Sequence, residues 1–153
     1  MPKRRVPSEL FLVNILVAVD KIMRHSKFLA YADFLKDEKI FGFLTRELQE
    51  IGESVNKLLK AGSFSLSENR KWKKVVDFRN VVVHKYFGVH PEIVFEIITK
   101  NVLVLKDDIL EFIQGLENKV IFFQALSDTK KVYLNLGRYE TVAYLDKIKE
   151  MLS

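Results

Sequence analysis

Four side chains that can carry acid–base or anion chemistry lie close together in one apolar stretch of the chain: Arg79, Asn80, His84 and Tyr86. Histidine has an ordinary pKa near neutral pH, so it suits proton transfer. An arginine guanidinium can donate two parallel hydrogen bonds to an anion such as phosphate. Segment 77–88 is therefore the first candidate for a functional site.

This segment is predicted to lie on a helix of about residues 66–87. Ser65 and Glu68 have the spacing of a capping box, which favours a helix start. Gly88 is expected to end the helix, because glycine tolerates the backbone conformation found just after a helix. The candidate side chains therefore have fixed directions around one helix axis.

A helical wheel divides the candidate residues into two directions. At about 100° per residue, Tyr86 returns to within about 20° of Arg79, on the apolar face that also holds Trp72. Asn80 and His84 lie about 100–140° further round. Either long side chains converge near the helix end, or a second copy of the helix completes the site. We favour the second copy, since dimerisation would also cover the strongly apolar first helix.

A structural role is an alternative for each residue. Arg79 could pair with an acidic residue of another helix, because a buried arginine needs a partner. His84 could be an ordinary histidine near a helix C-terminus, where the helix dipole favours its charged form. The spacing of Arg79 and His84 alone does not decide between these roles and function.

The rest of the chain is predicted to be all-α. Apolar residues recur at helical spacing, and the expected helices cover about residues 8–26, 40–59, 91–115, 120–134 and 139–152. Ser8 is the expected N-cap of the first helix, which is apolar nearly all round and should be buried on more than one side. Gly62 should end the second helix, and an irregularity is expected at Lys100-Asn101.

We expect residues 1–115 to form a helical bundle, with residues 116–153 as a helical hairpin packed on the same domain. A chain of 153 residues suits one core. The net charge of +5 permits an anionic partner, and the absence of cysteine excludes disulfides and thiolate metal sites. No metal-ligand spacing occurs among the three histidines. The apolar run after the basic N-terminus is too short to span a membrane, so we expect a cytoplasmic protein.

The string from Arg79 to Tyr86 resembles the R-N-x-x-x-H-x-Y signature of HepT-like toxins in the HEPN superfamily. Other positions agree with this resemblance: Trp72, Phe87-Gly88-Val89, Arg46 with Ile51-Gly52-Glu53, and residues 94–98, although Phe95 stands where that family usually has tryptophan. The resemblance covers about residues 8–115 and implies a HEPN-type four-helix bundle. It leaves the hairpin unexplained.

The resemblance implies a metal-independent endoribonuclease that acts as a homodimer, with no cofactor. In that case His84 would serve as acid and base, Arg79 would stabilise charge on the phosphate, and Asn80 would orient the imidazole or hold the phosphate. The product would be a 2′,3′-cyclic phosphate. Lys73, Lys74 and Lys85 are weaker candidates for RNA binding.

The resemblance also implies a partner, an MNT-type nucleotidyltransferase that silences the toxin by transferring AMP to Tyr86. Two other functions stay open. The chain could be a non-catalytic HEPN-like subunit that docks with a minimal nucleotidyltransferase, or a purely structural helical dimer.

Overall fold

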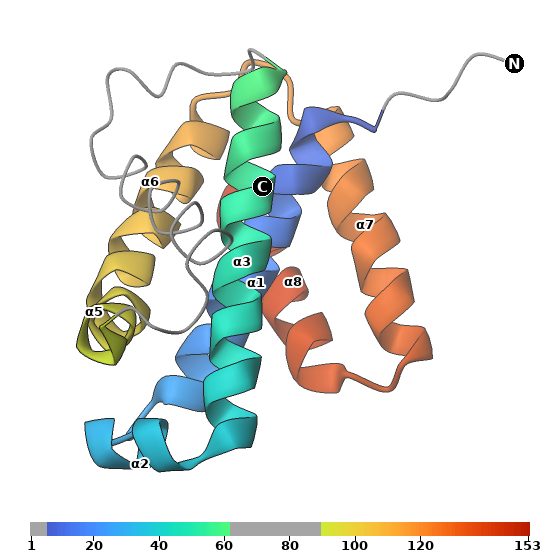
Figure 1. Cartoon of the computed structure of the whole chain (residues 1–153). Helices are drawn as coiled ribbons and strands as arrows, with labels where there is room; N and C mark the ends of the chain where they lie inside the picture. Colours follow the sequence, from blue (N-terminus) through green and yellow to red (C-terminus); the bar gives the residue numbers. More distant parts are fainter. Residues whose placement is uncertain (1–5, 62–89) are drawn as a thin grey trace, which may run out of the picture.

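The computed structural model describes residues 6–61 and 90–153, where every regular element is helical (Figure 1). The predicted all-α class is confirmed. The elements are α1 (Ser8–Ser26), α2 (Tyr31–Lys36), α3 (Glu38–Lys60), α5 (Pro91–Glu96), the π-helical turn η2 (Ile97–Asn101), α6 (Val102–Gln114), α7 (Val120–Asn135) and α8 (Tyr139–Leu152). None of the helices in these two ranges is both long and apolar enough to cross a membrane. The predicted helix 66–87, with Ser65, Glu68 and Gly88, lies outside the described residues, as does Gly62.

Helix α1 is the centre of the fold. It contacts α3, α6, α7 and α8, and Figure 1 shows α6 and α7 on opposite sides of the α1–α3 pair. Eight of its residues are buried, and they surround the helix axis: Leu12, Val13, Ile15, Leu16, Val17, Ala18, Val19 and Ile22. The prediction of burial on several sides is confirmed. Because helices of the same chain cover α1, its burial gives no argument for a dimer, and the dimer stays a prediction.

The start of α1 differs from the prediction by one position. Pro7 is the cap residue, with an extended backbone, and Ser8 is the first helical residue. Proline can occupy this position because the first backbone N–H groups of a helix have no partner within it. The side chain of Pro7 makes no capping hydrogen bond.

Between the first two predicted helices, the chain reverses and forms the short helix α2. Phe28 has a φ of 65°, which turns the chain away after α1. Asp37 then caps α3, because its carboxylate accepts hydrogen bonds from the backbone N–H groups of Lys39 and Ile40 at 3.0 and 3.1 Å. The predicted apolar stripe of α3 faces the core through Leu44, Leu48, Ile51, Val55 and Leu58.

The irregularity predicted near Lys100 is confirmed as the turn η2. Here the N–H of Val102 donates to the carbonyl of Ile97, five residues back rather than four. The hydroxyl of Thr99 donates to the carbonyl of Phe95 at 2.8 Å. The extra residue allows Ile98 and the buried residues of α6 to face the same core.

Helices α7 and α8 form the predicted hairpin. Gly137 has a φ of 69°, a conformation that glycine adopts without strain, and the N–H of Arg138 donates to the carbonyl of Tyr133 at 2.9 Å. The hairpin adds Phe122, Leu126, Leu145, Ile148 and Leu152 to the apolar cluster that contains α1. The domain boundary at residue 115 stays a prediction.

Replacing Phe122 by alanine should test whether this shared core unfolds as one unit. Phe122 is fully buried, so Phe122→Ala should lower the free energy of unfolding by about 3–5 kcal/mol. Urea unfolding followed by circular dichroism should keep a single transition with a lower midpoint, because the hairpin and bundle share side chains.

The matched control is Val120→Ala on the same helix. Val120 is 70% exposed, so this change should alter the free energy of unfolding by less than about 0.5 kcal/mol. Two separate transitions in Phe122→Ala, with the later one at the wild-type midpoint, would contradict a common core.

Candidate functional site

The residues predicted to carry the chemistry lie outside the described residues. These are Arg79, Asn80, His84, Tyr86, Lys73, Lys74 and Lys85. The described chain reaches Ala61 after α3 and resumes at His90 before α5. The roles of the seven side chains, and their positions relative to one another, stay predictions.

Arg46 and Ile51-Gly52-Glu53, which agree with the resemblance to HepT-like toxins, all lie on α3 within the described residues. Some of these residues are buried in the core and others lie at the surface. Ile51 and Gly52 are buried on α3, Glu53 is half-buried, and Arg46 is exposed. The apolar part of this pattern therefore serves packing. Arg46 instead lies in the wall of a surface hollow that contains other charged residues.

Phe95, at the position where tryptophan is usual, belongs to an aromatic cluster. Its ring centroid lies 5.3 Å from that of Tyr31, edge to face, and 5.3 Å from that of the buried Phe34. Phe34 also packs on Phe41 at 4.9 Å. These contacts join α5 to α2 and α3. Phe95 is thus a packing residue that holds the end of α5 against α2.

Two hollows of about 510 Å³ each lie where the hairpin meets α1 and α3. Lys21, Phe43 and Arg138 line both, so the two hollows adjoin; together they are called the junction groove. The first is also lined by Arg24, His25, Gly137, Tyr139, Glu140 and Thr141. The second is also lined by Asn14, Val17, Ala18, Arg46, Glu47, Glu50, Thr129 and Tyr133. Volumes of this size are typical of small-ligand sites.

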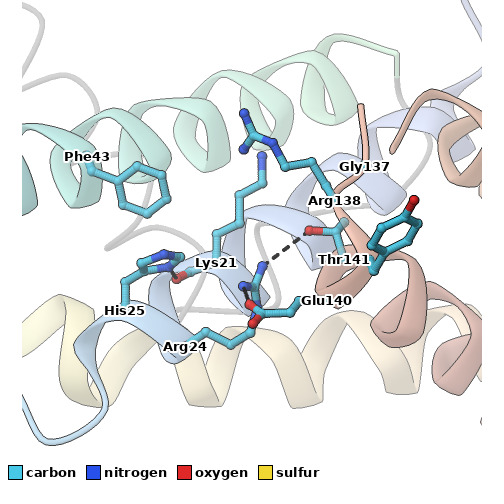
Figure 2. Close-up of a pocket in the computed structure, with 9 residues that line it drawn as sticks. Lys21, Arg24, His25, Phe43, Gly137, Arg138, Glu140 and Thr141 are labelled. Atoms are coloured by element: carbon cyan, nitrogen blue, oxygen red, sulfur yellow. Dashed lines mark hydrogen bonds and ion pairs between the residues drawn. The ribbon is translucent and has the colours of Figure 1, made fainter. Parts of the chain in front are cut away.

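Arg24 fixes the hairpin turn to α1. Its guanidinium donates to Asp20 at 2.9 Å, to Thr141 at 3.2 Å and to the carboxylate of Glu140. Figure 2 shows Arg24 turned toward Glu140 and Thr141. Burial raises the pKa of Asp20, although the hydrogen bond and charge of Arg24 oppose this shift. The donors of Arg24 are therefore largely committed within the protein.

Lys21 is held from two sides but keeps donor capacity. Its ammonium donates to the hydroxyl of Tyr133 at 2.8 Å and lies 3.9 Å from Glu47. An ammonium has three donors, so Lys21 can still bind a further acceptor. Burial raises the pKa of Glu47, and the nearby charge of Lys21 partly offsets this effect.

Arg46 and Arg138 differ from Lys21 and Arg24 in being exposed. Within residues 6–61 and 90–153, neither forms an ion pair with a carboxylate. In Figure 2 the side chains of Arg138 and Lys21 both extend toward the α3 side of the groove. The groove therefore presents two guanidinium groups that form no ion pair with a carboxylate of the described ranges, although Glu47 and Glu50 line the second hollow.

Sequence reasoning missed the junction groove. Lys21 and Arg138 are far apart in the chain, and only the packing of the hairpin on α1 brings them to one surface. The charged residues after the apolar run of α1 were the one available signal. They marked the end of the buried stretch without indicating what would cover it.

Comparison with protein families shows that residues 15–115 match the family described as "Ribonuclease HepT-like". The chain belongs to this family. The resemblance noted from the motif at Arg79–Tyr86 is thus confirmed, and the all-α bundle agrees with it. Helices α7 and α8 lie beyond the matched residues.

Several relatives are named as ribonucleases. "Putative RNase MJ0127" of Methanocaldococcus jannaschii is 31% identical over 119 residues, which are 78% of this chain and 96% of the relative. "Putative RNase TTE0752" of Caldanaerobacter subterraneus is 30% identical over 105 residues, 68% and 92% of the two chains. "Probable ribonuclease HepT" of Thermococcus cleftensis is 26% identical over 96 residues, 63% and 86%. No solved structure matches. The family and these relatives support an RNase-type function.

The half-buried Glu47 predicts a pH dependence of stability. Because its pKa is raised in the fold above the ordinary value of 4.5, the unfolded chain loses this proton first as pH rises. The fold is therefore destabilised between about pH 4.5 and the raised pKa. Glu47→Gln removes this titration. The free energy of unfolding of the variant should therefore rise relative to that of the wild type as pH increases from 4 to 7.

Urea unfolding at several pH values measures this difference, with the exposed Glu117→Gln as the control. The control should run parallel to the wild type. If the free energy of unfolding of Glu47→Gln instead falls relative to that of the wild type as pH rises, Lys21 outweighs the burial of the carboxylate; if it stays constant relative to the wild type, the two effects cancel and the prediction is wrong.

Proposed function

We propose that the protein is a metal-independent endoribonuclease, the toxin of a toxin–antitoxin pair. The observation that carries this proposal is the string R-N-x-x-x-H-x-Y from Arg79 to Tyr86, which falls inside the family-matched residues 15–115. The names of the relatives agree with action on RNA. Toxicity and the partner rest on the resemblance to HepT-like toxins.

The proposed reaction needs two proton transfers and charge stabilisation. A base removes the proton of a ribose 2′-hydroxyl, and this oxygen attacks the adjacent phosphorus. The bond from phosphorus to the 5′-oxygen breaks, and an acid protonates that oxygen, which leaves a 2′,3′-cyclic phosphate. His84 supplies the base and acid, while Arg79 donates to the phosphate oxygens as charge builds. Asn80 orients the imidazole or holds the phosphate.

A homodimer would provide two copies of His84 at one cleft. The wheel directions of Arg79 and His84 differ by about 140°, so one helix does not aim both at the same atom. Since α1 is covered within one chain, the proposal of a shared cleft depends on this divergence and on the resemblance. Lys73, Lys74 and Lys85 would hold the RNA backbone.

The proposed antitoxin is an MNT-type nucleotidyltransferase that acts on Tyr86. The phenol oxygen of Tyr86 would attack the α-phosphate of ATP, lose its proton and release pyrophosphate. Tyr86 lies within about 20° of Arg79 on the wheel. The attached AMP would therefore put a phosphate beside the guanidinium and block RNA at the same position.

The catalytic assignment predicts that His84→Ala and Arg79→Ala lose RNA cleavage in the presence of EDTA. Removing a general acid–base group typically costs about 10²–10⁴-fold in rate, and removing a charge-stabilising donor about 10²–10³-fold. Cleavage of a labelled RNA on a denaturing gel, with analysis of the 2′,3′-cyclic end, measures this loss.

The matched control is His90→Ala. His90 is exposed, lies outside the motif and contacts Glu92 at 3.3 Å, so this variant should cleave like the wild type. Unchanged cleavage by the His84 and Arg79 variants would remove them from the mechanism. No cleavage by the wild type at any dose, with tight co-purification of a nucleotidyltransferase, would favour the non-catalytic subunit. A strict monomer in light scattering at micromolar concentration would exclude the shared cleft.

The modification site predicts that Tyr86→Phe stays active when the partner nucleotidyltransferase and ATP are present. The wild type should gain the mass of one adenylate and lose RNase activity, whereas Tyr86→Phe should gain no mass. Intact-mass spectrometry and the RNA cleavage assay on the same samples follow both changes.

Tyr31→Phe is the control for this experiment, because Tyr31 lies on α2, outside the motif and both hollows. It should be modified and silenced like the wild type. An adenylate on Tyr86→Phe, or silencing of the wild type without an adenylate, would assign neutralisation to another residue or to binding alone.

A further inference from the structure

The junction groove lies between the part of the chain that defines the family and the part that does not. Lys21, Phe43 and Arg46 come from α1 and α3, within the matched residues 15–115. Arg138 comes from the hairpin turn and Glu140 from the first turn of α8, both beyond the matched residues. Any ligand of this groove is therefore recognised by the hairpin and the bundle together.

The charges of the first hollow favour an anion. Its lining holds three permanently cationic side chains, Lys21, Arg24 and Arg138, and one carboxylate, Glu140. Glu140 already accepts a hydrogen bond from Arg24. Arg138 has no carboxylate partner in the described ranges, and Lys21 has donor capacity left. Both can therefore bind the same anionic group.

The rings beside these cations favour a nucleic acid over a simple anion. The rings of Phe43 and His25 lie 4.6 Å apart at 52°, and Tyr139 is 69% exposed at the same hollow. Aromatic faces beside cations are typical of surfaces that bind single strands, because every base can stack on them. The carboxylates of Glu47 and Glu50 line only the adjoining hollow, so the first hollow is the better place for a phosphate.

We propose that the junction groove binds a single RNA strand, with a backbone phosphate held by Arg138 and Lys21 and a base against Phe43. This inference rests on the proposed action on RNA. None of the residues that line the two hollows belongs to the catalytic motif, so the groove should act on affinity. A strand bound here by the hairpin is kept close to the protein between encounters with the catalytic motif.

Binding of a fluorescent 2′-O-methyl RNA to the full chain tests the proposal. This RNA has no free 2′-hydroxyl, so it cannot be cleaved by the proposed reaction, and binding is scored apart from catalysis. Arg138→Gln should weaken binding on the order of tenfold. It should also lower the slope of log affinity against log salt by about 0.7, the loss of one phosphate contact on a single strand. Phe43→Leu should weaken binding with little change in this slope.

Lys147→Gln is the matched control, because it removes one positive charge from an exposed position of α8 that lines neither hollow. Its binding should stay within about twofold of the wild type. Thermal unfolding of each variant verifies that it is folded. Equal weakening by Arg138→Gln and Lys147→Gln would overturn the site, since only overall charge would then matter.

Two further ligands distinguish RNA from other anions. If Arg138→Gln weakens binding of AMP but not of RNA, the site belongs to a free nucleotide and the proposal fails. If a poly-glutamate peptide binds with the same dependence on Arg138 and Phe43, the partner is an acidic protein and the proposal also fails. If the wild type binds RNA through the groove but does not cleave it, only the proposed function is overturned. If the wild type cleaves RNA and Arg138→Gln binds RNA as well as the wild type does, only this inference is overturned.

Discussion

Helix α1 offers almost no polar face to water over its central part, and the burial of this helix determines how the others are arranged. A helix that is apolar all round must be covered on every side. Among the described elements, α3, α6, α7 and α8 all contact it. The free energy gained is that of removing eight apolar side chains from water. The hairpin is therefore part of what makes α1 stable in this chain.

The same constraint changes the argument about a second subunit. An apolar helix that is predicted from sequence has two possible covers, another part of its own chain or another copy, and periodicity does not distinguish them. Here Phe122, Leu126 and Leu145 of the hairpin belong to the same buried cluster as the apolar residues of α1. A dimer must then be held by other surfaces. The divergence of Arg79 and His84 is the remaining sequence argument for one.

Most helices were predictable because their signals are local. The apolar stripe from Leu44 to Leu58, the proline at the start of α5 and the glycine at the hairpin turn each act within a few residues. The motif at Arg79–Tyr86 was likewise readable, because its residues lie on one predicted helix. The junction groove was not predictable, because Lys21 and Arg138 meet only through the packing of α7 and α8 on α1. Local pattern carries no information about such long-range contacts.

The shape of the junction groove follows from the contacts that fix the hairpin turn. Arg24 joins Asp20 of α1 to Glu140 and Thr141 of α8, and Lys130 pairs with Asp146 across the hairpin at 2.6 Å. Arg138 lies directly before this anchored end of α8, so its backbone is held although its side chain is exposed. A cation placed in this way loses little backbone freedom when it binds an anion, which favours affinity. The ion pairs and hydrogen bonds of Arg24 thus also fix the backbone beside Arg138, whose guanidinium has no carboxylate partner in the described ranges.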